Sequence, residues 1–288
     1  MTFIEKHGSQ PNGTGSYELD LTEIDNFDLA WRPLNPQTDV FCSAGLTLPD
    51  RAGRLIDVGG WSDPSTFGVR LYWPDGSPGV WGTNDWEEDY HTVHLQVARW
   101  YPSAMMMSNG SILVVGGEIG SNSDQQPNLE ILPPTGGGLV FLDFLNRTNP
   151  NNLYPFLAIM PSGGIFIQYY NEARILDPVT FDTIKILPGV PCHVSQPDGG
   201  RSYPQEATMM LLPQYAPYTD LVTVLICGGS TVDYGDAIDN CVSTQPEAAN
   251  PVWVIERMVR SLSPLPQIFT AQKPNINANF LFLIFSHQ

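Results

Sequence analysis

The residues of this sequence best suited to chemistry are its cysteines, histidines and tyrosines. The cysteines are Cys42, Cys192, Cys227 and Cys241, and the histidines are His7, His91, His94, His193 and His287. Thiolates and imidazoles bind metals, but a tight site brings several such ligands together. His91 and His94 lie in the acidic stretch DWEEDYHTVH, where no third ligand is evident. We therefore interpret both as solvated side chains rather than as a metal site.

Two of the cysteines are spaced for a disulfide. Cys227 ends an apolar run, and Cys241 follows 14 residues later. In an oxidising compartment a bridge between them would close a short loop and restrict the unfolded chain. The alternative is a pair of buried thiols. In the first interpretation Cys192 is left over.

A two-part pattern repeats along the chain. An apolar run ends in Gly-Gly at residues 55–60 (LIDVGG), 112–117 (ILVVGG) and 224–229 (VLICGG), and a related run at 165–170 (IFIQYY) lacks the glycines. Another apolar segment precedes each run, and three of these segments begin with Tyr-Pro, at residues 101, 154 and 203. The remaining segment begins at Phe41, so Cys42 falls near the place of those tyrosines.

Two short apolar segments joined by a turn and repeated every ~50 residues are typical of a propeller blade. A blade is a small antiparallel sheet that must stack on its neighbours to cover both faces. The 26 glycines and 26 prolines agree with many short strands. We predict an all-β fold, a kelch-type β-propeller with about four to five blades visible of a probable seven. The alternative is a β-sandwich whose Gly-Gly pairs recur by coincidence.

We expect three segments in the chain. Residues 1–38 are expected to form a partial blade or an entry segment, and residues 39–258 the propeller. Residues 259–288 contain no Asp, Glu, Gly, Trp or Tyr, and they show neither part of the repeat. We interpret this atypical tail as lying outside the fold. The alternative is an extension in which FLFLIF pairs as one strand on an exposed sheet edge.

The charge balance excludes some partners. Acidic residues number 30 against 13 basic ones, for a net charge of −17. This charge repels a phosphate backbone or an anionic lipid surface, so we expect neither nucleic acid nor a membrane as partner. We also expect the protein to be a monomer. The sequons at Asn12, Asn109 and Asn146 predict glycosylation and an extracellular location. The first residues nevertheless contain no apolar signal core.

Longer stretches resemble a known family. FCSAGLTLPDRAGR, QVARWYPSAMMMSNGSILVVGGEIGSN, NLYPFLAIMPSGGIFIQYYNEARILD and RSYPQEATMMLLPQYAPYTDLVTVLICGGST look like the N-terminal region of fungal glyoxal oxidases, which are similar to galactose oxidase. The similarity extends from about Asp39 to Met258. The resemblance implies a copper-radical oxidase, in which copper and a tyrosyl radical each accept one electron. It also implies small aldehyde substrates such as glyoxal and methylglyoxal, oxidised by O₂ to carboxylic acids with release of H₂O₂.

The resemblance also assigns two residues. In the family the radical tyrosine is joined by a thioether to a cysteine, and the sulfur spreads the unpaired spin. Cys42 matches the cysteine motif, and Tyr101 matches the tyrosine motif in Ala-Arg-Trp-Tyr. They are the candidate catalytic pair, with Tyr101 as a copper ligand, and their matching places in adjacent repeats predict that they meet near the centre of the propeller. Without the resemblance, Cys42 is a small buried residue and Tyr101 a core tyrosine.

Three copper ligands remain unassigned, a second tyrosine and two histidines, which follow much later in the family. A copper site with one protein ligand does not hold its metal in the required geometry. We therefore expect a truncated form that retains neither copper nor oxidase activity by itself. The alternative is a non-catalytic kelch-like propeller that binds protein or carbohydrate through its loops.

Overall fold

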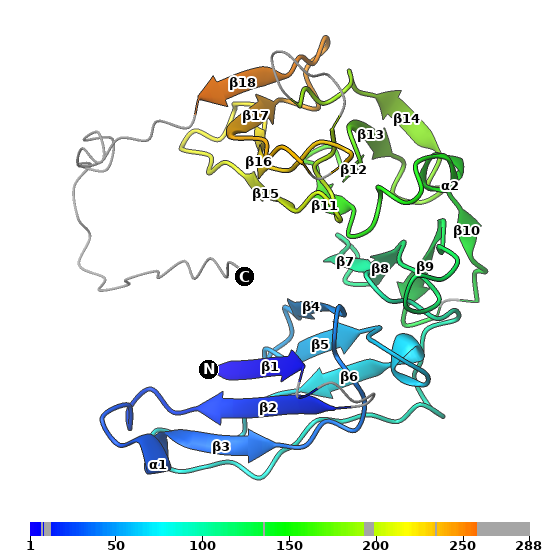
Figure 1. Cartoon of the computed structure of the whole chain (residues 1–288). Helices are drawn as coiled ribbons and strands as arrows, with labels where there is room; N and C mark the ends of the chain where they lie inside the picture. Colours follow the sequence, from blue (N-terminus) through cyan, green and yellow to red (C-terminus); the bar gives the residue numbers. More distant parts are fainter. Residues whose placement is uncertain (7, 9–12, 135, 193–198, 234, 258–288) are drawn as a thin grey trace. The chain divides into compact units, whose positions relative to one another are not determined.

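The computed structural model describes residues 1–6, 8, 13–134, 136–192, 199–233 and 235–257. Residues Met1–Arg257 form one compact unit, and its regular elements are nearly all β-strands. Five antiparallel sheets follow one another along the described part of the chain (Figure 1). The prediction of an all-β fold built from successive blades is therefore confirmed. The predicted tail at 259–288 lies outside the described residues.

Strands that follow each other in sequence pair in space within every sheet. The first sheet contains β1 (Thr2–Lys6), β2 (Thr14–Leu19) and β3 (Trp31–Leu34), with the short helix α1 (Phe27–Ala30) before β3. The second contains β4 (Ala44–Thr47), β5 (Leu55–Val58) and β6 (Val69–Tyr72), with the 3-10 turn η1 (Ser65–Phe67) before β6. The third contains β7 (Ser103–Met106), β8 (Ile112–Val115), β9 (Asn128–Leu132) and β10 (Val140–Phe141), and helix α2 (Asp143–Arg147) follows it. The fourth contains β11 (Phe156–Ile159), β12 (Ile165–Tyr169), β13 (Glu172–Leu176) and β14 (Thr183–Ile186). The fifth contains β15 (Ala207–Leu211), β16 (Val224–Gly228), β17 (Asn240–Thr244) and β18 (Val254–Arg257).

The two-part repeat of the sequence forms the first two strands of the second to fifth sheets. Hydrophobic side chains then pack each of these sheets against the next, because successive residues of a strand face opposite sides of its sheet. Val114 packs toward the second sheet, whereas its neighbour Val115 packs toward the fourth. The fourth and fifth sheets meet through Phe166 and Val242, among others. Each blade thus covers a face that its neighbour cannot bury alone.

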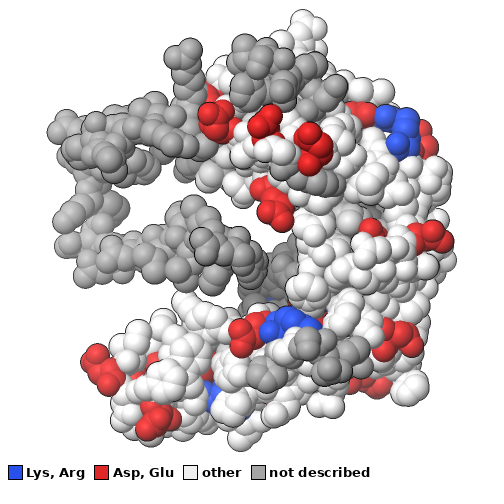
Figure 2. Space-filling view, viewed as in Figure 1, with Lys and Arg blue, Asp and Glu red and all other residues white. Residues whose placement is uncertain are grey.

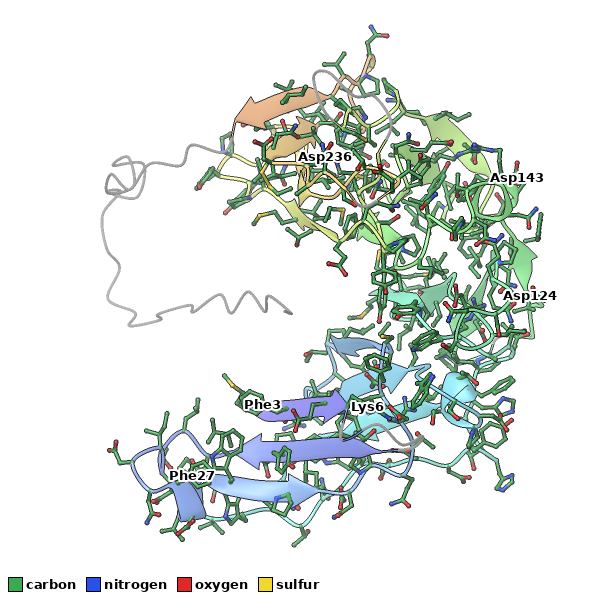
Figure 3. All side chains as sticks on the ribbon, in the orientation of Figure 1. Phe3, Lys6, Phe27, Asp124, Asp143 and Asp236 are labelled. Carbon is green, nitrogen blue, oxygen red and sulfur yellow. A yellow bond between two sulfur atoms is a disulfide. The ribbon has the colours of Figure 1, made fainter. Side chains whose placement is uncertain are left out.

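The first sheet is joined to the second by a smaller core. Trp86 is 8% exposed and packs with Leu34 and Tyr72, and its indole N–H donates to Ser16 Oγ at 2.8 Å. Residues 1–38 therefore contain a three-stranded sheet with its own contacts to the second sheet. The rings of Phe3 on β1 and Phe27 on α1, both labelled in Figure 3, have their centroids 5.3 and 6.2 Å from the ring of Trp31.

The Gly-Gly pairs end strands where two stretches of backbone come very close. Gly60 has a φ of 139°, and a Cβ there would overlap the carbonyl oxygen of Asp39. Gly117 has a φ of 93°, and a Cβ would lie 2.7 Å from the carbonyl oxygen of Trp100. Both conformations are ones that only glycine adopts without strain. The glycines thereby let the segment before each first strand cross directly over the end of a second strand.

Acidic side chains are scattered over the face shown in Figure 2 rather than gathered into one patch. Most side chains there carry no charge. Within the described residues, no helix is both long and apolar enough to cross a membrane.

Candidate functional site

The segments that enter β4, β7 and β11 share an unusual backbone. Cys42, Tyr101 and Tyr154 each lie two residues before their strand and have φ values of 58°, 61° and 47°. The amide of Tyr101 donates to the carbonyl of Cys42 at 2.9 Å, and the amide of Tyr154 donates to that of Tyr101 at 3.2 Å. Three consecutive blades are therefore connected, residue to residue, through a left-handed conformation that costs energy outside glycine. Such strain is typical of functional sites.

An aromatic cluster surrounds this backbone chain. Trp100, Tyr101 and Leu153 are buried, and the partly buried side chains that pack on them are Cys42, Trp61, Tyr154 and Tyr203. The Tyr101 ring lies 4.1 Å from the Trp100 ring and stacks on Tyr203 at 4.5 Å, with 19° between the planes. The hydroxyls of Tyr101 and Tyr203 are 3.2 Å apart, within hydrogen-bonding distance. The ring of Tyr154 meets that of Tyr101 edge-on at 5.3 Å.

The Cys42 thiol lies within this cluster. Burial raises the pKa of the thiol, and the polar groups of the neighbouring Tyr101, Tyr154 and Trp100 side chains only partly offset this rise. Burial also raises the pKa of Tyr101, and its contacts with Tyr203 and Cys42 add to the rise. The pKa of Tyr154 is raised by burial and by Cys42. All three groups are therefore protonated at neutral pH, so the cluster presents neutral phenols around a neutral thiol.

A buried ion pair supports the turn that contains Cys42. Arg70 is fully buried, and its Nη1 donates to Asp57 Oδ1 at 2.8 Å. The other carboxylate oxygen of Asp57 accepts a hydrogen bond from Ser43 Oγ at 2.7 Å. Burial raises the pKa of Asp57 to about 6, although Arg70 and Ser43 both favour its charged form. Ser43, the residue after Cys42, is thus hydrogen-bonded to the buried Asp57–Arg70 ion pair.

Arg99, two residues before Tyr101, has its guanidinium surrounded by hydrogen-bond acceptors, an arrangement called the cradle below. Its Nη1 donates to the carbonyls of Gly116 and Asn128 at 2.7 and 3.3 Å, and its Nη2 donates to Asn128 Oδ1 at 2.6 Å. Its Nε donates to Glu130 Oε1 at 2.8 Å, and both side chains are fully buried. The guanidinium therefore ties the segment before Tyr101 to the second and third strands of the same sheet.

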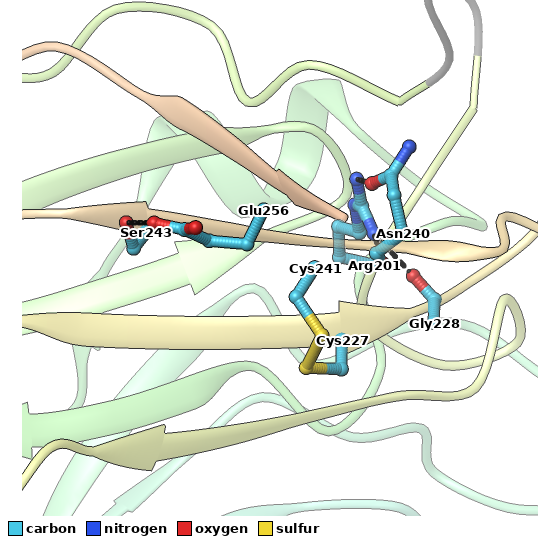
Figure 4. Close-up of a disulfide and its surroundings, with 7 residues drawn as sticks. All are labelled: Arg201, Cys227, Gly228, Asn240, Cys241, Ser243 and Glu256. Carbon is cyan, nitrogen blue, oxygen red and sulfur yellow. Dashed lines mark hydrogen bonds between the residues drawn. A yellow bond between two sulfur atoms is a disulfide. The ribbon is translucent and has the colours of Figure 1, made fainter. Parts of the chain in front are cut away.

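The fifth sheet repeats this cradle around Arg201, two residues before Tyr203. Arg201 Nη1 donates to the carbonyls of Gly228 and Asn240 at 2.5 and 3.3 Å, and Nη2 donates to Asn240 Oδ1 at 2.9 Å (Figure 4). Val242 stands where Glu130 stands in the third sheet, two residues after the asparagine. No described residue accepts a hydrogen bond from Nε of Arg201. The cradle is common to both sheets, whereas the carboxylate is not.

Tyr203 does not occupy the position that the repeat predicts. Ala207 pairs with Gly228, and the pairing of β7 with β8 puts Pro102 opposite Gly116, so Glu206 corresponds to Tyr101. Glu206 has the same left-handed backbone, with a φ of 58°. Tyr203-Pro204 therefore lies three residues closer to the N-terminus than Glu206-Ala207, the pair equivalent to Tyr101-Pro102. The extra residues let the Tyr203 side chain reach back and stack on Tyr101.

The structure also gives the surroundings of the other predicted residues. Cys227 and Cys241 face each other on β16 and β17 and form a disulfide (Figure 4). Cys192 is buried, and its thiol donates to the carbonyl of Gly199 at 2.9 Å. His91 and His94 are exposed, with His94 stacked on Tyr90 at 5.1 Å.

Among the sequons, Asn109 is exposed in the β7–β8 turn, and Asn146 is exposed on α2. Figure 3 labels Asp143 at the start of that helix. Asn12, His7, His193 and His287 lie outside the described residues.

The donors of the aromatic cluster do not make a complete copper site. Copper(II) prefers a tetragonal arrangement of nitrogen and oxygen ligands. The cluster offers the hydroxyls of Tyr101 and Tyr203 and the Cys42 thiol, and the described histidines His91 and His94 belong to a different, exposed loop. The described residues contain no group of three His, Cys, Asp or Glu side chains that could hold a metal. These residues by themselves therefore do not fit a tightly held copper ion.

The family model for the glyoxal oxidase N-terminus matches residues 21–264. The chain belongs to this family. It is 57% identical over 284 residues to a WSC domain-containing protein of Arthroderma benhamiae, and this match covers 98% of the chain and 30% of that protein. It is 31% identical over 240 residues to the aldehyde oxidase GLOX of Vitis pseudoreticulata, over 79% of the chain and 42% of that protein.

A solved structure of a fungal alcohol oxidase of the AA5 family, in complex with copper, matches with a TM-score of 0.55 at 15% identity. The match covers 88% of the chain and 50% of that structure, and it shows that the two share a fold. The chain spans less than half of the length of the curated relatives it matches. The glyoxal oxidase N-terminus is therefore a region of larger proteins in these relatives.

Sequence reasoning singled out Cys42 and Tyr101 but gave no role to Tyr154, Tyr203 or Arg99. A signal was present, because the motif Arg-x-Tyr-Pro occurs at 99–102 and again at 201–204. Two copies of one motif in a repeat protein point to the same environment. The stacking of Tyr203 on Tyr101 had no such signal, since it depends on the three-residue shift in the fifth sheet.

Proposed function

We propose that this chain is the radical-tyrosine region of a copper-radical oxidase that acts on small aldehydes. The observation behind the proposal is the arrangement of Cys42 and Tyr101, with the thiol packed beside the phenol inside a cluster of aromatic rings. The reaction would be RCHO + O₂ + H₂O → RCOOH + H₂O₂, with glyoxal or methylglyoxal as substrate. Membership of the glyoxal oxidase family and the named activity of the Vitis pseudoreticulata relative support this assignment.

The chemistry assigned to the pair is formation of a thioether. The Cys42 sulfur would bond to a ring carbon of Tyr101, with loss of one S–H and one C–H hydrogen. O₂ would accept the two electrons and two protons and become H₂O₂, so the step balances. The neutral thiol, the buried phenol, the tilted ring of Trp100 and the stacked ring of Tyr203 suit a radical that must be shielded from solvent. Tyr101 would be the contribution of this chain to the copper site.

The same proposal includes the location and the limits of the chain. We place the protein outside the cell, because it contains a disulfide and exposed sequons at Asn109 and Asn146. We assign the sheets to a seven-bladed, kelch-type propeller that acts as a monomer. Residues 1–288 alone should not turn over substrate, since the described part supplies no imidazole beside Tyr101. Purified chain given copper(II) and methylglyoxal should release no H₂O₂ in a peroxidase-coupled assay.

A single cross-linking event is less demanding than turnover, so it tests the proposal with this chain. The chain, with its Cys227–Cys241 disulfide intact, is incubated with excess copper(II) in air, and its intact mass and tryptic peptides are measured. We expect loss of two hydrogens and one peptide that joins Cys42 to Tyr101. The Cys42→Ala and Tyr101→Phe variants should show neither change. An unchanged wild-type mass, or a bond from Cys42 to Tyr154 instead, would contradict the proposal.

A further inference from the structure

The turn at Cys42 is strained, so the surrounding structure must hold it in place. Cys42 has a φ of 58°, which is unfavourable for a residue with a side chain. Within the turn, the amide of Phe41 donates to Asp39 Oδ1 at 2.9 Å, and the amide of Ser43 donates to the carbonyl of Val40 at 3.0 Å. These local bonds leave the side chain and the carbonyl of Ser43 to bind elsewhere.

The Ser43 hydroxyl binds the interior of its own sheet. It donates to Asp57 on β5, and Asp57 is fixed in turn by Arg70 on β6. Asp57 is 5% exposed and Arg70 is fully buried. Neither partner can move without leaving a charge in the interior, which is costly. The hydroxyl therefore meets an acceptor with a fixed position.

The Ser43 carbonyl binds a residue from a different sheet. The hydroxyl of Tyr154 donates to it at 3.0 Å, across a sequence separation of 111 residues. The amide of Tyr154 donates to the carbonyl of Tyr101, and the Tyr154 ring contacts the Tyr101 ring edge-on. Tyr154 thus holds both the turn that contains Cys42 and the residue that Cys42 faces.

We propose that Asp57, acting through the Ser43 hydroxyl, and Tyr154 are positioning residues that hold the Cys42 turn beside Tyr101 from two sides. The use of this clamp, which is to fix the sulfur against the phenol ring, rests on the proposed function. The clamp itself is a property of the fold. Asp57 and Tyr154 would act on the geometry of the pair without reacting themselves.

Reactivity of the Cys42 thiol is the direct measure of this clamp. The copper-free chain of 288 residues is treated with iodoacetamide under native conditions, and alkylation of Cys42 and of Cys192 is followed separately by peptide mass spectrometry. Cys192 is 1% exposed and lies in the segment between β14 and β15, away from the Cys42 turn, so it reports global loosening in the same sample. The variants are Ser43→Ala, which leaves the ion pair intact, and Tyr154→Phe, which keeps the ring.

We expect each variant to alkylate Cys42 about fivefold faster than wild type, the factor that one net hydrogen bond contributes to a local opening. Alkylation of Cys192 should stay unchanged. Ser43→Thr restores the hydroxyl and should return Cys42 to the wild-type rate. As a matched control, Tyr169→Phe removes a tyrosine hydroxyl that bonds Glu172 within its own sheet, and it should leave Cys42 unaffected.

Two results would overturn the inference. One is a Cys42 rate that is unchanged in either Ser43→Ala or Tyr154→Phe. The other is a rise of Cys42 and Cys192 together, which would mean that the variants loosen the whole fold. Because alkylation requires neither copper nor oxygen, its outcome does not depend on the outcome of the cross-linking experiment. If the variants alter alkylation as expected but no thioether forms in the wild type, the proposed function is refuted and the clamp is not.

Discussion

The buried Arg99–Glu130 pair gives the sharpest test of how the segment before Tyr101 is held. The perturbation is Glu130→Gln, which keeps the shape and one acceptor oxygen but removes the negative charge. Both side chains are fully buried, and the second carboxylate oxygen accepts the amide of Gln96 at 2.6 Å. The substituted NH₂ group would face either this amide or the guanidinium, and both are donors.

The magnitude follows from the burial. Removing one partner of a buried pair costs about 3–5 kcal/mol, because a charge is left uncompensated. We expect the lower value of this range for Glu130→Gln, since the oxygens of Gly116 and Asn128 still accept hydrogen bonds from the guanidinium. We expect a loss of about 3 kcal/mol in the free energy of unfolding, or about 6–12 °C in Tm for a protein of this size.

Urea unfolding followed by tryptophan fluorescence measures this loss. Glu172→Gln is the matched control, because it removes the same charge from an exposed pair with Arg147, where the side chains are 29% and 53% exposed. That variant should lose less than about 1 kcal/mol. A loss of less than about 1 kcal/mol for Glu130→Gln would refute the reasoning. It would mean that carbonyl and amide oxygens suffice for a buried guanidinium, as they do around Arg201.

Two further predictions concern stability. Replacing both Cys227 and Cys241 by alanine opens a loop of 14 residues and should cost about 3 kcal/mol in urea unfolding, because the unfolded chain regains the conformations that the bridge removed; an unchanged midpoint would contradict this. The pKa of Asp57 is raised from 3.8 to about 6, so between these pH values the native state keeps a proton that the unfolded state releases. The free energy of unfolding should therefore fall as pH rises from 4 to 6, by up to about 3 kcal/mol, and Asp57→Asn should abolish this component. Parallel pH profiles of the two proteins would disprove the assignment.

The sequence predicted the sheets well because the signals are local. An apolar run that alternates between two faces and ends at Gly-Gly needs few other contacts to become a strand, and Leu55–Val58 and Ile112–Val115 are both such strands. The third strand of the second sheet and the third and fourth strands of the three sheets that follow were not predicted, since their repeats are weaker. The first sheet was anticipated only as a partial blade or entry segment.

The site was predictable in part. Cys42 and Tyr101 have matching places in adjacent repeats, and the spacing of the repeat brings matching residues of neighbouring blades together. Tyr203 shows where this reasoning stops. Tyr203 lies three residues before the position in its sheet that is equivalent to Tyr101. This shift puts the ring of Tyr203 on the ring of Tyr101.

The sequence by itself therefore determined the repeat, its paired strands and the equivalent positions of Cys42, Tyr101 and Tyr154, because each depends on neighbours along the chain. Only the tertiary structure decided which side chains meet across blades. Tyr154 reaches Ser43 across 111 residues, and Tyr101 reaches Tyr203 across 102. Contacts of this kind depend on how sheets pack and on where each backbone crosses a glycine, and no local pattern of residues contains that information.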